Sequence, residues 1–132
     1  MQKSISTYTI NVLSSDSAQI GGQILFYATG NLFSGRIDFY RAGTTAPAPY
    51  LWHPNSVTDN NQIYIVLAMQ MDQFENVCSL VRNEGPWMME LWPSTSPMIG
   101  ASTSGYGGKI FTSTNEPIGE EERSFQSSLV KA

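Results

Sequence analysis

Alternating apolar and polar residues near the start of the chain indicate a strand with one buried face. Tyr8, Ile10 and Val12 fall on one side of residues 7–13, and polar residues separate them. A later run, QIYIVLAM at residues 62–69, is apolar on both sides, which predicts a strand that is central in its sheet or covered on both faces. Shorter extended segments are predicted at residues 50–53, 86–93 and 109–114.

A hairpin is predicted within residues 23–43, where the pattern I-x-F-Y-x-x-G occurs twice. We expect a two-residue turn at Gly30-Asn31, and a loop over residues 30–33 is the alternative. The facing pairs on the apolar side are then Phe26 with Gly35, Phe39 with Gly22, Ile24 with Ile37, and Ala28 with Phe33. Each phenylalanine has a small residue across the strand pair, which is expected to leave room for its ring.

Helical spacing of apolar residues predicts one α-helix near residues 72–83, within MDQFENVCSLVRNEG. Asp72 and Glu75 are typical of a capping box at its start, and Gly85-Pro86 is typical of a helix end. Cys78 is the single cysteine and lies on the apolar side of this helix. A disulfide within the chain is therefore excluded, and we expect a buried, unreactive thiol.

These elements predict a mainly β fold, an antiparallel barrel or sandwich of about six or seven strands. The one helix is expected to pack on the sheet or to close one end of the barrel. The 132 residues are the size of one domain. We place a single β-rich domain at residues 1–115 and an acidic, polar C-terminal tail at residues 116–132. Residues 44–49 and 99–108 are predicted to be loops.

Composition narrows the class of partner. Only 14% of the residues are charged, and the net charge is −4 with no run of lysine or arginine. Binding to nucleic acid and to an anionic membrane are therefore both disfavoured. No apolar run reaches the length of a membrane-spanning helix, and the first residues lack the apolar centre of a signal peptide. We therefore expect a soluble, cytoplasmic protein.

The residue types that usually carry catalysis do not form a recognisable set in this sequence. His53 is the only histidine, so a metal site with several histidine ligands is excluded within one chain. The segment around Ser102 and Ser104 matches neither a nucleophile elbow nor a phosphate-binding loop. The glutamate run at residues 120–122 is more typical of a solvated surface than of a calcium site. We predict no catalytic residue, no metal site and no cofactor.

Aromatic residues near predicted loops are the remaining candidates for ligand binding, because they combine a flat apolar surface with hydrogen-bonding groups. The candidates are Tyr50, Trp52, His53, Trp92 and Tyr106. The leading hypothesis is a non-catalytic binding or interaction module, accessory or regulatory, with a protein partner. A carbohydrate-binding, lectin-like domain is the alternative, and a small enzyme is the third hypothesis. An uncovered edge strand in so weakly charged a chain also favours a homodimer.

Three stretches resemble small bacterial proteins of unknown function. They are the doubled I-x-F-Y-x-x-G, LVRNEGP at residues 80–86 and EPIGEEE at residues 116–122. A β-hairpin, a helix that ends before a proline and an acidic C-terminal end recur in those proteins. The shared features are turns and helix ends, so the resemblance implies no activity and no catalytic residue.

Overall fold

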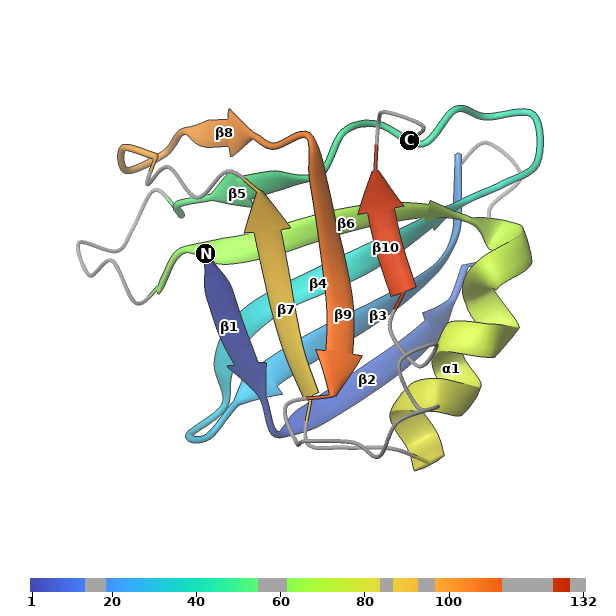
Figure 1. Ribbon diagram of the computed structural model, residues 1–132, viewed down its shortest axis with the longest axis horizontal. Coiled ribbons are helices and arrows are strands. Elements are labelled where there is room, and N and C mark those ends of the chain that lie inside the picture. The colour runs from blue at the N-terminus through green and yellow to red at the C-terminus, as the bar shows by residue number, and fades with distance from the viewer. Residues whose placement is uncertain (14–18, 55–61, 84–86, 93–96, 113–124, 129–132) are drawn as a thin grey trace, which may run out of the picture.

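The computed structural model describes residues 1–13, 19–54, 62–83, 87–92, 97–112 and 125–128. Most of these residues belong to strands, and the strands form two sheets that lie face to face (Figure 1). The predicted mainly β fold is confirmed. Of the two architectures that we considered, the sandwich is the one observed, since neither sheet closes on itself to form a barrel.

Among the described residues, the larger sheet has six strands and the smaller sheet has four. The larger sheet contains, in spatial order, β2 (Thr7–Val12), β3 (Ile20–Ala28), β4 (Leu32–Tyr40), β6 (Tyr64–Gln70), β5 (Tyr50–Trp52) and β8 (Ser102–Ser104). The smaller sheet contains β1 (Gln2–Ile5), β7 (Trp87–Trp92), β9 (Gly107–Thr112) and β10 (Phe125–Ser128). Paired strands run antiparallel except β4 and β6, which run parallel. Along the chain β5 comes before β6, and β6 then lies between β4 and β5. Because β6 runs antiparallel to β5, it runs parallel to β4.

The predicted hairpin is confirmed as β3 and β4, and most of its register is as predicted. Gly22 faces Phe39, Ile24 faces Ile37, and Phe26 faces Gly35. The predicted pairs nearest the turn are wrong, because Tyr27 pairs with Phe33 and Ala28 pairs with Leu32. A bulge at Ser34 shifts the register there by one residue, and residues 29–31 form the turn. Gly30 and Asn31 both have positive φ, at 83° and 62°.

Gly22 and Gly35 face Phe39 and Phe26, as predicted, but the space that they leave is not occupied by those rings. A Cβ atom at Gly22 would lie 2.6 Å from the ring of Phe74 in the helix. A Cβ atom at Gly35 would overlap the carbonyl oxygen of Ile65 in β6 and lie 3.0 Å from the Met89 sulfur of the smaller sheet. The missing side chains therefore accommodate the helix and the neighbouring strand, rather than the rings of Phe39 and Phe26.

The predicted helix is confirmed, with a 3₁₀ turn, η2 (Met71–Gln73), leading into α1 (Phe74–Asn83). The predicted capping box is wrong, because Asp72 lies inside η2 and the residue at the N-cap position, Gln70, makes no side-chain capping hydrogen bond. The predicted helix end at Gly85-Pro86 lies outside the described residues. In the part of the chain that the structure describes, no helix has the length and apolar character needed to cross a membrane.

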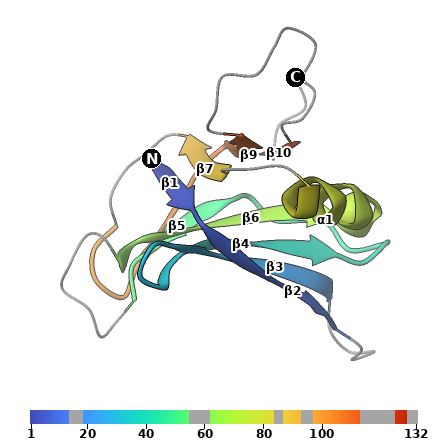
Figure 2. The ribbon, with the colours of Figure 1, turned by 90° about the horizontal axis from the view of Figure 1, so that it is seen from below.

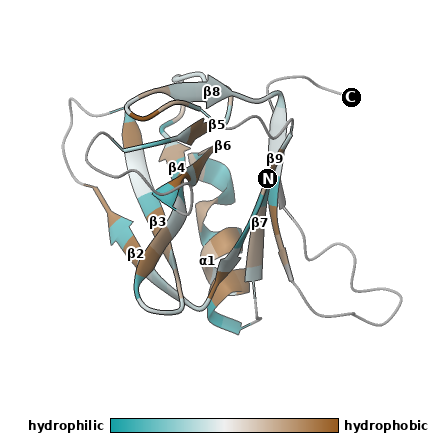
Figure 3. Cartoon of the chain, turned by 90° about the vertical axis from the view of Figure 1, so that its left-hand side faces the viewer, coloured by the Kyte–Doolittle hydropathy of each residue, from teal (hydrophilic) through white to brown (hydrophobic). Residues whose placement is uncertain are grey.

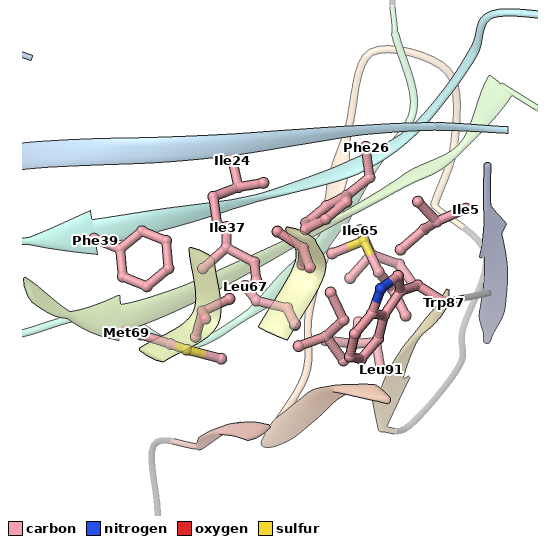
Figure 4. Packing of buried hydrophobic residues seen from close by; sticks show 14 of the residues in the cluster. Ile5, Ile24, Phe26, Ile37, Phe39, Ile65, Leu67, Met69, Trp87 and Leu91 are labelled. Atoms are coloured by element: carbon pink, nitrogen blue, oxygen red, sulfur yellow. The ribbon is translucent and has the colours of Figure 1, made fainter. Parts of the chain in front are cut away.

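The core lies between the two sheets, and α1 closes one side of it (Figure 3). Apolar side chains of the larger sheet meet those of the smaller sheet (Figure 4). The residues that both sheets contribute include Phe26, Ile37, Phe39, Ile65, Leu67, Trp87, Met89 and Leu91. The ring of Phe74 packs edge to face on Phe39, with 4.9 Å between the ring centroids, so the helix seals the core with its apolar side.

At two corners within the described residues, a strand of one sheet continues directly into a strand of the other. β1 continues into β2 through Ser6, and β8 continues into β9 through Gly105 and Tyr106. The loop predicted over residues 99–108 is therefore wrong from Ser102 onward. A Cβ atom at Gly105 would lie 2.5 Å from the Trp92 carbonyl oxygen, so this glycine permits a close backbone crossing rather than a flexible loop.

The predicted C-terminal tail contains an element that we did not expect. Phe125–Ser128 form β10, which pairs antiparallel with β9 at the edge of the smaller sheet. Residues 116–124 and 129–132 lie outside the described residues. A short polar strand of this kind is held by backbone pairing, which leaves no apolar pattern for sequence reasoning to find.

Candidate binding face

The larger sheet has one face toward the core and one face that no described element covers. Figure 2 shows α1 and the smaller sheet together on the same side of it. Alternation along the strands places the neighbours of the core residues on the other side. We call this side the polar-aromatic face, and it carries Gln23, Leu25, Tyr27, Phe33, Arg36, Asp38, Tyr40, Tyr50, Trp52 and Tyr64.

A charged pair lies near the middle of the polar-aromatic face. Arg36 and Asp38 are two residues apart on β4, so both side chains point to the same side of the sheet. The Arg36 Nε atom donates hydrogen bonds to both carboxylate oxygens of Asp38, at 3.1 Å each. From β3, Gln23 Nε2 donates a further hydrogen bond to Asp38 Oδ1, at 2.9 Å. The carboxylate is thus held from its own strand and from the next.

A second contact joins this pair to β5. Arg36, Val66 and Tyr50 lie in register across three neighbouring strands. The Arg36 Nη2 atom donates a hydrogen bond of 3.3 Å to the Tyr50 hydroxyl and so crosses above Val66. This explains why Val66 is only 2% exposed on a face that no described element covers. The polar side chains are therefore part of a fixed layer.

Aromatic rings form a row beside the charged pair. The Phe33 ring lies 5.7 Å from that of Tyr27 and 4.7 Å from that of Tyr64, measured between centroids. Trp52 pairs with Tyr64 across β5 and β6. The bulge at Ser34 brings Phe33 into this row, because it shifts the register of β4 by one residue. All four rings are partly exposed, so a ligand can reach them.

The ionisation states of Arg36, Tyr40 and Tyr64 on this face are stable near neutral pH. Burial raises the pKa of Tyr40, and Asp38 raises it further. Burial also raises the pKa of Tyr64, although Arg36 opposes part of that rise. Burial disfavours the charged form of Arg36, but attraction to Asp38 and their hydrogen bonds outweigh it, so the pKa of Arg36 is raised. The phenols therefore stay neutral while the guanidinium stays charged.

The structure does not bring all the predicted site residues together. Tyr50 and Trp52 lie on the polar-aromatic face. His53 is 2% exposed, its ring Nδ1 lies 3.3 Å from the Pro54 carbonyl oxygen, and its backbone pairs with residues 100 and 101. Trp92 and Tyr106 lie at the corner between β8 and β9, where the Tyr106 N–H donates to the Trp92 carbonyl oxygen at 2.8 Å.

Sequence reasoning did not select Arg36, Asp38, Gln23 or Tyr64 as site residues. The predicted pairing of Ile24 with Ile37 implies Gln23 opposite Asp38 and Leu25 opposite Arg36, and both pairs are observed. The available signal was two charges at alternate positions of a strand, in a chain with 14% charged residues. A charge on a partly buried sheet face is costly unless it has a partner, so two opposite charges at alternate positions of a strand predict a hydrogen-bonded pair.

The other pocket and side-chain groups of the described residues are weaker candidates for a functional site. A pocket of about 220 Å³ lies where β1 passes the end of the β3–β4 hairpin, and its lining includes Lys3, Phe33 and Ser34. This volume is below the range typical of small-molecule sites. Within the described ranges, no group of three or more histidine, cysteine, aspartate or glutamate side chains could hold a metal ion. Cys78 is buried as predicted, and burial raises the pKa of its thiol.

Comparisons of this chain with known protein families, with characterised proteins and with solved structures found no match. The resemblance to small bacterial proteins therefore has no support from them.

Proposed function

We propose that this chain is a non-catalytic binding module and that the polar-aromatic face is its binding surface. The observation that supports the proposal is the arrangement of Arg36, Asp38, Gln23 and Tyr50 beside a row of partly exposed rings. Hydrogen bonds already fix these side chains before a ligand arrives, which reduces the entropy lost on binding. Sites built on strands also hold their geometry better than sites built on loops.

The surface suits a partner of low charge. The positive charge of Arg36 is balanced by Asp38 at 3.1 Å, so the centre of the face has donors and acceptors but little net charge. Tyrosine and tryptophan are enriched in protein interfaces because each buries a large area and keeps a polar group. A protein partner that presents polar and aromatic groups is therefore the leading candidate.

A carbohydrate is the second candidate, and the row of rings favours it. The flat apolar side of a sugar ring can lie on Trp52 or Tyr64, while its hydroxyl groups reach the adjacent polar side chains. Neutral sugars fit better than acidic ones, because the Arg36 charge already has its counter-ion. His53, which we predicted for such a site, is buried and would not contact the ligand.

The test compares two tryptophans that differ in position. Trp52 lies on the polar-aromatic face, and Trp92 lies on the smaller sheet, so Trp92→Ala is the matched control for Trp52→Ala. Binding would be measured on a glycan array, by tryptophan fluorescence, and by pull-down from native lysate. We expect Trp52→Ala to weaken binding at least about tenfold, which corresponds to about 1.4 kcal/mol, and Trp92→Ala to leave it unchanged. Weakening by Trp92→Ala alone would place the site elsewhere, and no binding in any assay would contradict the proposal.

A further inference from the structure

Strand β2 forms one edge of the larger sheet, and its sequence does nothing to prevent further pairing. On the described part of the chain, β2 pairs with β3 on one side and with no strand on the other. Proteins usually protect such an edge with charged residues, proline or a bulge. The six residues of β2, TYTINV, include neither a charged residue nor proline.

The backbone of β2 presents regularly spaced hydrogen-bonding groups on that open side. The Leu13 N–H donates to the Gly21 carbonyl oxygen at 3.0 Å, in line with the β2–β3 register. In an antiparallel ladder, hydrogen-bonded pairs alternate with non-bonded ones, so residues 7, 9 and 11 also bond to β3. The N–H and C=O groups of Tyr8, Ile10 and Val12 therefore point away from β3.

The side chains of the same residues form an apolar row on the core side of the strand. Tyr8, Ile10 and Val12 face Phe26, Ile24 and Gly22, respectively. Ile10 packs against the core, while Tyr8 is 38% exposed and Val12 is 72% exposed. Tyr8 and Val12 thus remain exposed to solvent on either side of the partly buried Ile10. The strand that carries them can still pair with another strand.

We propose that a second copy of this chain pairs with β2 and that the two β2 strands run antiparallel about a twofold axis at Ile10. In the joined sheet, side chains of residues that face each other across the two β2 strands must lie on the same side. The residues that exchange backbone hydrogen bonds must be those whose N–H and C=O groups point away from β3. With the axis at Ile10, Tyr8 lies opposite Val12 of the partner subunit, and Val12 lies opposite the partner's Tyr8. The pairing covers the exposed apolar residues with each other.

A second copy fits this edge better than an unrelated strand, because the row is complementary to itself about Ile10. An axis at Thr9 would place Tyr8 opposite Ile10 of the partner subunit and leave Val12 in solvent. The twofold axis stands perpendicular to the sheet, so the polar-aromatic faces of both subunits lie on the same side. This last consequence rests on the proposed function, since it makes the dimer bivalent for a ligand that carries two matching groups.

The experiment uses two double variants of the full chain. Tyr8→Glu with Val12→Glu places like charges opposite each other across the interface, and Tyr8→Lys with Val12→Glu places opposite charges there. Light scattering and sedimentation would give the mass of each protein over a range of concentrations. We expect the wild type to have twice the 14.6 kDa mass of the chain. We expect the Lys/Glu variant to dimerise at least about tenfold more tightly than the Glu/Glu variant.

A monomeric wild type at high concentration would overturn the proposal, and so would equal dimerisation of both variants. A second measurement uses the wild type alone, so its result does not depend on whether the variants fold. Hydrogen exchange at the amides of Tyr8, Ile10 and Val12 should slow as protein concentration rises, because dimerisation gives these groups partners. Exchange that does not depend on concentration would overturn the proposal. Neither measurement involves ligand binding, so the failure of one proposal is distinct from the failure of the other.

Discussion

The Arg36–Asp38 pair is asymmetric in its access to water. The Asp38 side chain is 4% exposed, whereas the Arg36 side chain is 27% exposed. The carboxylate therefore depends on Arg36 and Gln23 for its hydrogen bonds, while the guanidinium keeps contact with solvent. Removing one partner of a buried ion pair leaves the other charge uncompensated, and the cost depends on how well the remaining group can reach water.

We expect Arg36→Met to lower the free energy of unfolding by about 2–4 kcal/mol, because it leaves the buried Asp38 carboxylate without a counter-ion. Asp38→Asn should cost about 1 kcal/mol, since the remaining guanidinium can be solvated. Urea unfolding at neutral pH would measure both values. Equal costs, or a larger cost for Asp38→Asn, would contradict the asymmetry that the exposures indicate.

At the scale of single residues, the sequence indicated Tyr50 and Trp52 because loop-flanking aromatics are a common sign of binding. It also indicated His53, which the structure buries instead. Histidine has no fixed preference for surface or core, so its residue type alone could not decide between ligand contact and packing. The contact between Arg36 and Tyr50 joins β4 and β5 across β6. The sequences of β4 and β5 do not indicate that β6 lies between them, so this contact could not be predicted.

The hairpin of β3 and β4 shows how one glycine sets the spacing of an element. Gly35 lies where β6 runs parallel to β4, and any side chain there would meet the Ile65 backbone. Backbone cannot move aside as a side chain can, so even a methyl group should separate the strands. Gly30, at the turn, has positive φ but no atom within 4 Å of a Cβ position.

We expect Gly35→Ala to lower the free energy of unfolding by about 1–3 kcal/mol through overpacking. Gly30→Asn is the matched control, because asparagine accepts positive φ and the site is open, so its effect should stay within about 0.5 kcal/mol. Thermal and urea unfolding would compare the two variants with the wild type. A harmless Gly35→Ala would show that β4 and β6 do not approach as closely as described.

At the scale of elements, local periodicity was enough to predict the hairpin, the central strand β6, the helix and β7. It failed for β1, β8 and β10, each of which has only three or four residues. Strands this short carry too few positions for an apolar period, and each exists because a strand distant in the sequence pairs with it. The glycines at residues 105, 107 and 108 suggested flexibility, although Gly105 and Gly108 mark close approaches between backbones.

The stability of the whole molecule depends on the contact between its two sheets, which share one hydrophobic core. Leu67 of β6 and Gly108 of β9 meet at this contact, where a Cβ atom at Gly108 would lie 2.5 Å from Leu67 Cδ2. The same Cβ atom would lie 2.7 Å from the Glu90 carbonyl oxygen in β7. The absence of a side chain at Gly108 thus lets a large apolar side chain of the larger sheet pack directly on the backbone of the smaller one.

A double-mutant cycle tests whether the sheets pack as one unit. Leu67→Ala should cost about 2–5 kcal/mol by leaving a cavity, and Gly108→Ala should cost about 1–3 kcal/mol by overpacking. In the double variant the new methyl group enters the space that Leu67 vacates, so the combined cost should fall below the sum by at least about 0.5 kcal/mol. Tryptophan fluorescence and circular dichroism should also report the same unfolding midpoint, because one core links both sheets. Additive costs or separate midpoints would mean that each sheet is stabilised independently.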